Sequence, residues 1–227
     1  MKKSYLLRSF VIASLFSTTL IEAEVIKSYF KRGELKAVTH YVDGTHTEKR
    51  AGIKNGLEEI YYIEGPLAYR VNYVDGKRDG LLEWFDKKGR LLAKVHYKEG
   101  KLHGEEIHYF ENGVVKYRVT YVNDKKEGLQ KEYHDNGELA LVVPYKHGKK
   151  EGLQQEYTYT AALYSEVLYK NNYKEGLQIW YDTAGNVTKT ERYKMDRPVA
   201  VMKAIQQKKA EPNILVQGID FSPKKVQ

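Results

Sequence analysis

The sequence contains no cysteine in its 227 residues. This absence excludes disulfide bonds, catalytic thiolates and cysteine zinc sites. Tryptophan and phenylalanine are scarce, with 2 and 6 residues, against 20 tyrosines. No nucleophile elbow, phosphate-binding glycine loop or zinc-protease helix motif occurs. We therefore expect neither an enzyme nor a cofactor, and no residue is assigned a catalytic role.

The seven histidines give no metal-ligand pattern. Only His103 and His108 stand close together, and one of them falls in an expected turn. Because metal ligands must converge on one point, we expect no metal site. Acidic residues recur beside the expected turns, as at Glu127 and Glu151. We interpret them as solvated turn residues rather than as paired catalytic carboxylates.

The first 23 residues have the order of an export signal. A short basic head is followed by an apolar run from Ser9 to Ile21 and by a small residue, Ala23. This order is typical of a secretory signal, with cleavage expected after Ala23. The alternative is a retained anchor, but about 13 apolar positions are too few to cross ~30 Å of hydrocarbon. We expect a periplasmic or secreted protein.

A glycine recurs every 24 residues through six copies without a slip. These lead glycines are Gly56, Gly80, Gly104, Gly128, Gly152 and Gly176. A second column, four places before each lead glycine, holds Gly, Asp or Asn, the residues that best tolerate left-handed backbone. A third column, nine places after it, holds Gly in every copy but one, where Ala161 predicts a distorted turn. The regular period indicates a repeat architecture in which these residues form hairpin turns.

Aromatic and apolar residues keep the same register. Five places after the lead glycine stand Tyr61, Phe85, Tyr109, Tyr133, Tyr157 and Tyr181. Valine fills the fifteenth place in five copies, and tyrosine fills the seventeenth in all six. The alternation has period two, which predicts two strands of about seven residues per repeat. We expect an all-β protein: one elongated antiparallel sheet of about 13–14 strands.

The shared parity of the leucine, valine and tyrosine columns predicts one apolar face and one face of charged and amide residues. Residues 24–52 contain a degenerate copy of the repeat, followed by an insert at about Thr45 to Gly52, and residues 53–195 contain the six repeats. After Tyr193 the pattern is expected to stop. Residues 196–227 are then interpreted as a capping helix, Pro198 to Ala210, and a tail.

The repeat unit, as in GKLHGEEIHYFENGVVKYRVTYVND, resembles the MORN repeat. It resembles most the bacterial variant with the pattern G-x-x-x-G-x-x-x-x-Y-x-x-x-G, over about Tyr29 to Tyr193. The resemblance implies stacked β-hairpins in one curved sheet and a role in binding proteins or membrane lipids. Bacterial proteins of this type often carry a toxin–antitoxin label. Some resemble the repeat region of plant phosphoinositide kinases, but the kinase motifs are missing here, so that activity is not carried over.

Two features could bind a partner. The aromatic column five places after the lead glycine either packs the sheet together or forms a binding groove, and we favour packing. Lysines at the turns predict a basic rim that either serves solubility or attracts an anionic surface, and we favour solubility. The leading hypothesis is an exported scaffold that binds a protein or an anionic envelope surface. The alternatives are an antitoxin-like or immunity-like protein and an enzyme that no motif reveals. We do not expect nucleic acid as a partner for an exported chain.

Overall fold

A computed structural model describes residues 23–42 and 52–199, and every regular element in these ranges is a β-strand. The strands are β1 (Ala23–Tyr29), β2 (Leu35–Val42), β3 (Lys54–Tyr61), β4 (Leu67–Val74), β5 (Lys77–Phe85), β6 (Leu91–Lys98), β7 (Lys101–Tyr109), β8 (Val115–Val122), β9 (Lys125–Tyr133), β10 (Leu139–Lys146), β11 (Lys149–Lys150), β12 (Gly152–Tyr157), β13 (Leu163–Lys170), β14 (Tyr173–Tyr181), β15 (Val187–Lys194) and β16 (Arg197–Val199). None of the described elements is a helix long and apolar enough to cross a membrane.

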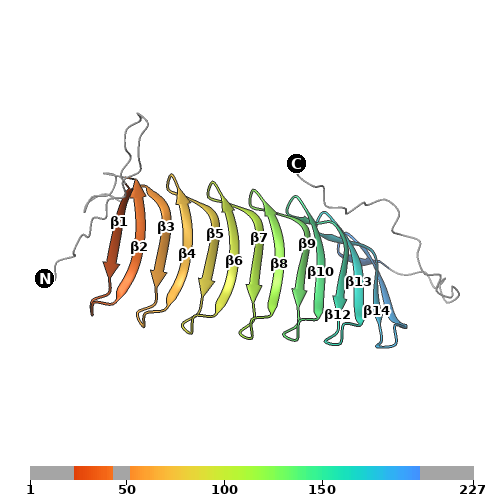
Figure 1. Cartoon of the computed structure of the whole chain (residues 1–227). Helices are drawn as coiled ribbons and strands as arrows, with labels where there is room; N and C mark the ends of the chain where they lie inside the picture. Colours follow the sequence, from red (N-terminus) through yellow and green to blue (C-terminus); the bar gives the residue numbers. More distant parts are fainter. Residues whose placement is uncertain (1–22, 43–51, 200–227) are drawn as a thin grey trace, which may run out of the picture.

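The strands form one open antiparallel sheet in which each strand pairs with its neighbours in the sequence. Figure 1 shows the resulting row of hairpins, which runs from β1 at one end to the last strands at the other. This confirms the all-β, single-sheet architecture. The sheet has 16 strands rather than 13–14. The additional pieces are short: β11 has 2 residues and β16 has 3.

Two kinds of turn alternate along the sheet. The first joins neighbouring hairpins through two residues that both have positive φ, such as Asp75 (48°) and Gly76 (77°). Positive φ at both places defines a type I′ turn, which matches the twist of antiparallel strands. Asp124 and Asn172 occupy the same place with φ of 66° and 74°. The interpretation of this glycine, Asp and Asn column as a left-handed position is therefore confirmed.

The second turn closes each hairpin through five residues. In the 62–66 turn, the Tyr62 amide donates to the Pro66 carbonyl at 2.9 Å, and the Gly65 amide donates to the Tyr62 carbonyl at 3.0 Å. The turn around Ala161 forms the same two hydrogen bonds, from Thr158 to Ala162 at 2.8 Å and from Ala161 to Thr158 at 2.9 Å. The prediction of a distorted turn at Ala161 is therefore wrong. Ala161 takes the left-handed conformation instead, with φ of 63°.

The expectation of one apolar and one charged face is also wrong. Leu57 pairs with Asn72, and Glu58 pairs with Val71, so the leucine and valine columns lie on opposite faces. Parity relates residues of one strand only, while pairing across the hairpin decides which face two strands share. We call the two sides the valine face (Val71, Val95, Val119, Val143, Val167) and the leucine face (Leu57, Leu81, Leu129, Leu153, Leu177).

The core of this single layer is the valine face. Val71, Val119, Val143 and Val167 are between 0% and 2% exposed. Taller side chains of the same face surround them, and around Val71 these include Tyr69, Tyr73 and Leu82. The tyrosine column seventeen places after the lead glycine lies on this face, because Tyr73 shares a strand and parity with Val71. Short valines beneath longer neighbours thus become buried without a second sheet.

The ends of the array differ from the sequence expectation. Met195 and Asp196 form another type I′ turn, with φ of 49° and 62°, so the pattern continues after Tyr193. Pro198 and Val199 lie in β16, which pairs with β15, and are not helical. The rest of the expected capping helix, from residue 200, lies outside the described residues. So do residues 1–22 of the expected signal and most of the insert at residues 43–51, beside which β2 and β3 pair directly.

Candidate functional site

The leucine face carries an exposed apolar row across β9 to β14. Leu129 pairs with Pro144, and Leu153 pairs with Leu168, so these residues lie opposite one another on neighbouring strands. Leu129, Leu153 and Leu168 are 43%, 42% and 44% exposed. Half-buried Leu177 continues the row on β14. We call these five residues the leucine row.

In the first half of the sheet the corresponding row is interrupted by polar residues, which alternate with Leu57 and Leu81. There the row contains Asn72, His96 and Thr120, one on each alternate strand. Ion pairs cross this half of the leucine face, including Arg70 with Glu83 at 2.6 Å and Arg118 with Glu105. The leucine face therefore has an N-terminal half in which leucines alternate with polar residues and a C-terminal half with a continuous apolar row. This division was not predicted, although the change from Thr120 to Pro144 and Leu168 in one column signals it.

Exposed lysines border the leucine face along the edge of the type I′ turns. Their positions follow from pairing: Lys98 with Lys101, Val122 with Lys125, and Lys146 with Lys149. Lys77 and Lys170 extend the line, and we call these seven lysines the lysine border. The other members of the expected basic rim point to the valine face, because side chains alternate along a strand. These are Arg78, Lys126, Lys150 and Lys174.

The predicted aromatic column also lies on the leucine face, near the five-residue turns. The Tyr61 hydroxyl donates to Glu59 two residues away at 2.9 Å, and the Arg70 guanidinium lies 5.9 Å from the Phe85 ring centre. Tyr157 donates to Gln155 at 3.2 Å and Tyr181 to Glu166 at 2.8 Å, while Tyr109 and Tyr133 lie near Arg118. All six rings are half-buried. Burial, with the Glu166 hydrogen bond, raises the pKa of Tyr181 to about 12.

The lead glycines are structural. All six have positive φ, between 79° and 120°. The strand pairing skips residues around them, as between Val71 and Tyr73, where Leu82 and Arg78 are the partners. At Gly104 a Cβ atom would also lie 2.9 Å from the Cβ atom of His96. A left-handed bulge inside a strand explains why glycine recurs there.

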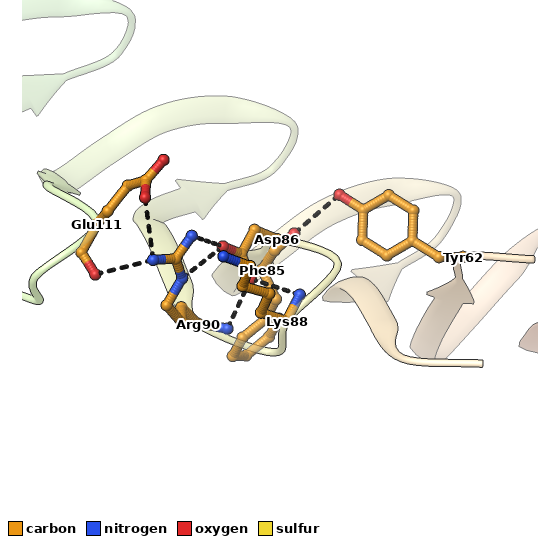
Figure 2. Close-up of polar contacts among 6 residues, drawn as sticks. All are labelled: Tyr62, Phe85, Asp86, Lys88, Arg90 and Glu111. Atoms are coloured by element: carbon orange, nitrogen blue, oxygen red, sulfur yellow. Dashed lines mark hydrogen bonds and ion pairs between the residues drawn. The ribbon is translucent and has the colours of Figure 1, made fainter. Parts of the chain in front are cut away.

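Hydrogen bonds between consecutive repeats hold the turns in line. Figure 2 shows one such set at the five-residue turns: Arg90 contacts Asp86 and Glu111, while the Tyr62 hydroxyl donates to the Phe85 carbonyl at 3.0 Å. At the type I′ turns the acidic residues before the lead glycines accept amide hydrogens. Glu151 accepts from the Asn171 amide at 2.7 Å. These carboxylates are turn acceptors rather than merely solvated residues.

The valine face carries a repeated contact between a cation, an acceptor and a ring. In the first repeat the Lys54 ammonium lies 2.5 Å from Glu58 and 4.8 Å from the centre of the Tyr73 ring. Lys126, Lys150 and Lys174 make the same two contacts in the last three repeats. In the second repeat Arg78 lies 5.4 Å from the Tyr97 ring centre.

The third repeat has no cation at this place, where Leu102 stands. Its acceptor Glu106 is bound by His108 at 2.8 Å and by the Tyr117 hydroxyl at 2.5 Å. The His108 and Tyr117 rings are stacked, with centres 4.4 Å apart. The His108 hydrogen bond, together with those of Tyr117 and Tyr121, lowers the pKa of Glu106 to about 2. Glu106 is therefore ionised across the physiological range.

No group of three or more His, Asp or Glu residues that could hold a metal ion occurs within residues 23–42 and 52–199. His103 and His108 do not form a joint site. The His108 ring bonds to Glu106, whereas the Nδ1 atom of His103 is buried without a hydrogen-bond partner.

A comparison with protein families matches the MORN repeat variant at residues 78–99, 102–123, 126–147 and 174–195. Each matched segment covers most of one repeat, from two residues before a lead glycine to the first residue of the next type I′ turn. The unmatched repeat between them contains Ala161 in place of the turn glycine. A search of curated proteins finds no match. The spacing, the stacked hairpins and the four matches together establish that this chain is a MORN-repeat protein.

Proposed function

We propose that the protein is an exported, non-enzymatic scaffold that binds a protein partner through the leucine row. The observation that carries the proposal is the exposure of Leu129, Leu153 and Leu168 on adjacent parts of one face. A contiguous exposed apolar patch on a folded protein marks an interaction surface. Export rests on the basic, apolar and small-residue order of the first 23 residues.

The shape and charge of this surface support one kind of partner. The leucine row crosses β9, β10, β12, β13 and β14, which are successive strands. At ~4.8 Å between strands, the row is about 19 Å long. An amphipathic helix of about 13 residues has the same length. Because the lysine border lies beside the row, a partner with acidic side chains next to its apolar stripe fits best.

The aromatic column has a supporting role in this proposal. Tyr133 and Tyr157 flank the leucine row but are half-buried and hydrogen bonded or close to charged neighbours. They hold the sheet surface in shape, and their exposed edges add contact area. The six predicted rings, Tyr61, Phe85, Tyr109, Tyr133, Tyr157 and Tyr181, thus remain proposed contacts rather than the principal anchors.

The test uses Leu153→Asp together with Leu168→Asp, both on the leucine face, and Trp84→Ser as the control. Trp84 is 48% exposed and lies on the valine face, opposite Ala93. A partner captured from the envelope fraction by the wild-type protein should lose affinity for the double variant by at least about tenfold and bind Trp84→Ser normally. Equal affinity for all three proteins would refute the leucine row.

Two further outcomes separate the alternatives. Sedimentation with vesicles of anionic phospholipid, prevented by salt and unaffected by Leu153→Asp, would assign binding to the lysine border and an envelope surface. A captured partner whose toxicity the wild-type protein neutralises would identify the antitoxin-type role. A protein that is cytoplasmic in native cells and keeps residues 1–23 would refute export.

A further inference from the structure

The third repeat departs from the other five at one place on the valine face. In four repeats a lysine ammonium fills the space between an acceptor oxygen and a tyrosine ring. The oxygen distances are 2.5, 2.6, 3.2 and 2.9 Å for Lys54, Lys126, Lys150 and Lys174. The third repeat keeps the acceptor and the ring, as Glu106 and Tyr121, but replaces the lysine with Leu102.

Glu106 is a stronger hydrogen-bond acceptor than the glutamine that most of these repeats have at the same place. Three of the four lysines face the neutral amide oxygen of a glutamine, whereas Glu106 is a carboxylate. Among the residues that the structure describes, the polar partners of Glu106 are His108, Tyr117 and Tyr121, and none of them is a lysine or an arginine. An ionised carboxylate beside tyrosine rings attracts a cation through both charge and ring face.

Strand pairing defines the surroundings of Glu106. Val119 lies opposite it on β8 and Val95 opposite it on β6, and both are nearly buried. On the same face, the stacked pair of His108 and Tyr117 stands on one side. Tyr121 stands on the other side, opposite Gly104, which has no side chain. The place is thus an apolar floor with aromatic walls and one carboxylate, whose only possible cationic partner among the described residues is the His108 ring at 2.8 Å.

We propose that Glu106, Tyr117 and Tyr121 form an ammonium seat that binds a primary ammonium group from outside the chain. The ammonium takes the position that Lys54 takes between Glu58 and Tyr73 in the first repeat. Its source is either a free alkylamine or the lysine side chain of a partner protein. The seat lies on the valine face, so its occupation is independent of the leucine row on the other side of the sheet.

The experiment titrates the full exported chain with n-butylammonium and follows the Glu106 carboxyl and Tyr121 ring signals by NMR. Butanol, which has the same apolar chain without the charge, is the ligand control. We expect saturable shifts with butylammonium and none with butanol. An N-acetylated lysine methylamide provides the second arm: tighter binding than butylammonium assigns the seat to a protein lysine, and weaker binding assigns it to a free amine.

The decisive variant is Leu102→Lys, which restores the residue found in the other repeats. Its ammonium should occupy the seat and weaken butylammonium binding at least about tenfold, while Leu102→Met should bind as the wild type does. Glu106→Gln should weaken binding by a similar factor. The proposal fails if the wild type gives no saturable shift, or if Leu102→Lys and Glu106→Gln both bind normally. Leu153→Asp should leave the titration unchanged, which separates this test from that of the proposed scaffold function.

Discussion

The carboxylate of Glu127 accepts a hydrogen bond from the backbone amide of His147, 2.7 Å away and 20 residues later in the chain. The contact joins one lead-glycine bulge to the next type I′ turn. Glu151 with Asn171 and Glu175 with Met195 repeat it. Glu127→Ala should therefore lower the free energy of unfolding by about 1 kcal/mol, because a turn amide loses its acceptor. Lys125→Ala, on the same edge, is the control, and equal denaturant midpoints for both variants would contradict the prediction.

Alanine substitutions of the lead glycines should fall into two classes that differ in the loss of stability. Gly128 has φ of 79° and open space within 4 Å of where a Cβ atom would lie, whereas Gly104 has φ of 106° and would place that atom 2.9 Å from His96. Alanine at either position is strained, but Gly104→Ala also forces a side chain to move. We expect Gly104→Ala to destabilise the protein more than Gly128→Ala, by about 1 kcal/mol or more. Thermal or denaturant unfolding of the two variants measures the difference.

Gly128→Val should destabilise the protein more than Lys126→Ala. A β-branched residue at positive φ costs roughly 1–3 kcal/mol. Lys126→Ala removes only the contacts with Gln130 and the Tyr145 ring. Gly128→Asn is the informative control, because asparagine tolerates the left-handed region and should recover part of the loss. If valine and asparagine prove equally harmful, the backbone angle is not the cause.

Ala161→Gly should stabilise the protein. Ala161 holds φ of 63° in a turn where the other repeats have glycine. Glycine relieves this strain in the folded chain, but it also has greater freedom in the unfolded chain. The net increase in the free energy of unfolding should be up to about 1 kcal/mol. Ala162→Gly, one residue later and without a positive φ, should be neutral or destabilising. The two midpoints in denaturant provide the measurement, and an unstable Ala161→Gly would contradict the account of the turn.

Glu106 should make the free energy of unfolding depend on pH in the acidic range. Its pKa is lowered from 4.5 to about 2 in the folded chain, chiefly by the His108 hydrogen bond. Because the unfolded chain binds the proton more readily, this contribution is present above about pH 4.5 and is lost as the pH falls towards 2. Solvent screens part of the charge, so we expect about 1 kcal/mol. The Glu106→Gln variant should lose less stability than the wild type over this range, whereas Glu138→Gln should follow the wild type.

The neighbours Lys149 and Lys150 should behave differently. Lys149 lies on the lysine border of the leucine face, while the Lys150 ammonium lies 4.7 Å from the Tyr169 ring centre on the valine face. Lys149→Ala should reduce the salt dependence of partner binding and leave stability unchanged. Lys150→Ala should lower stability by about 0.5–1 kcal/mol.

Tyr133→Ala, which truncates a ring beside the leucine row, should weaken partner binding once folding has been verified by circular dichroism.

The fold followed from the sequence because its determinants are local. The glycine, Asp and Asn column reports a backbone angle, and the alternation reports a strand, without knowledge of any partner strand. Hairpin connections then place each strand beside the next one. The expected end at Tyr193 was wrong because Met195 and Asp196 do not resemble a glycine turn, although Asp tolerates the required conformation.

The surfaces could not be predicted in the same way. Whether Leu57 joins Val71 or opposes it depends on the register across the hairpin, which the bulges of each repeat determine. The third-repeat cluster was missed for a different reason. Its signal is an exception, Leu102 in a basic column, and it becomes meaningful only when Lys54 shows what the other side chains contact.

The 20-residue reach of the Glu127 contact has a consequence for the evolution of the chain. Among the strands that the structure describes, each repeat pairs only with the repeats next to it in the sequence, so the array can be divided into equivalent units. Removal of residues 128–151 would bring Glu127 to the position before Gly152 and leave every remaining contact type intact. Such a change shortens the array by two strand spacings, ~9.6 Å. Gene duplication and deletion can therefore adjust the span of this protein in fixed steps while the shape of each step stays the same.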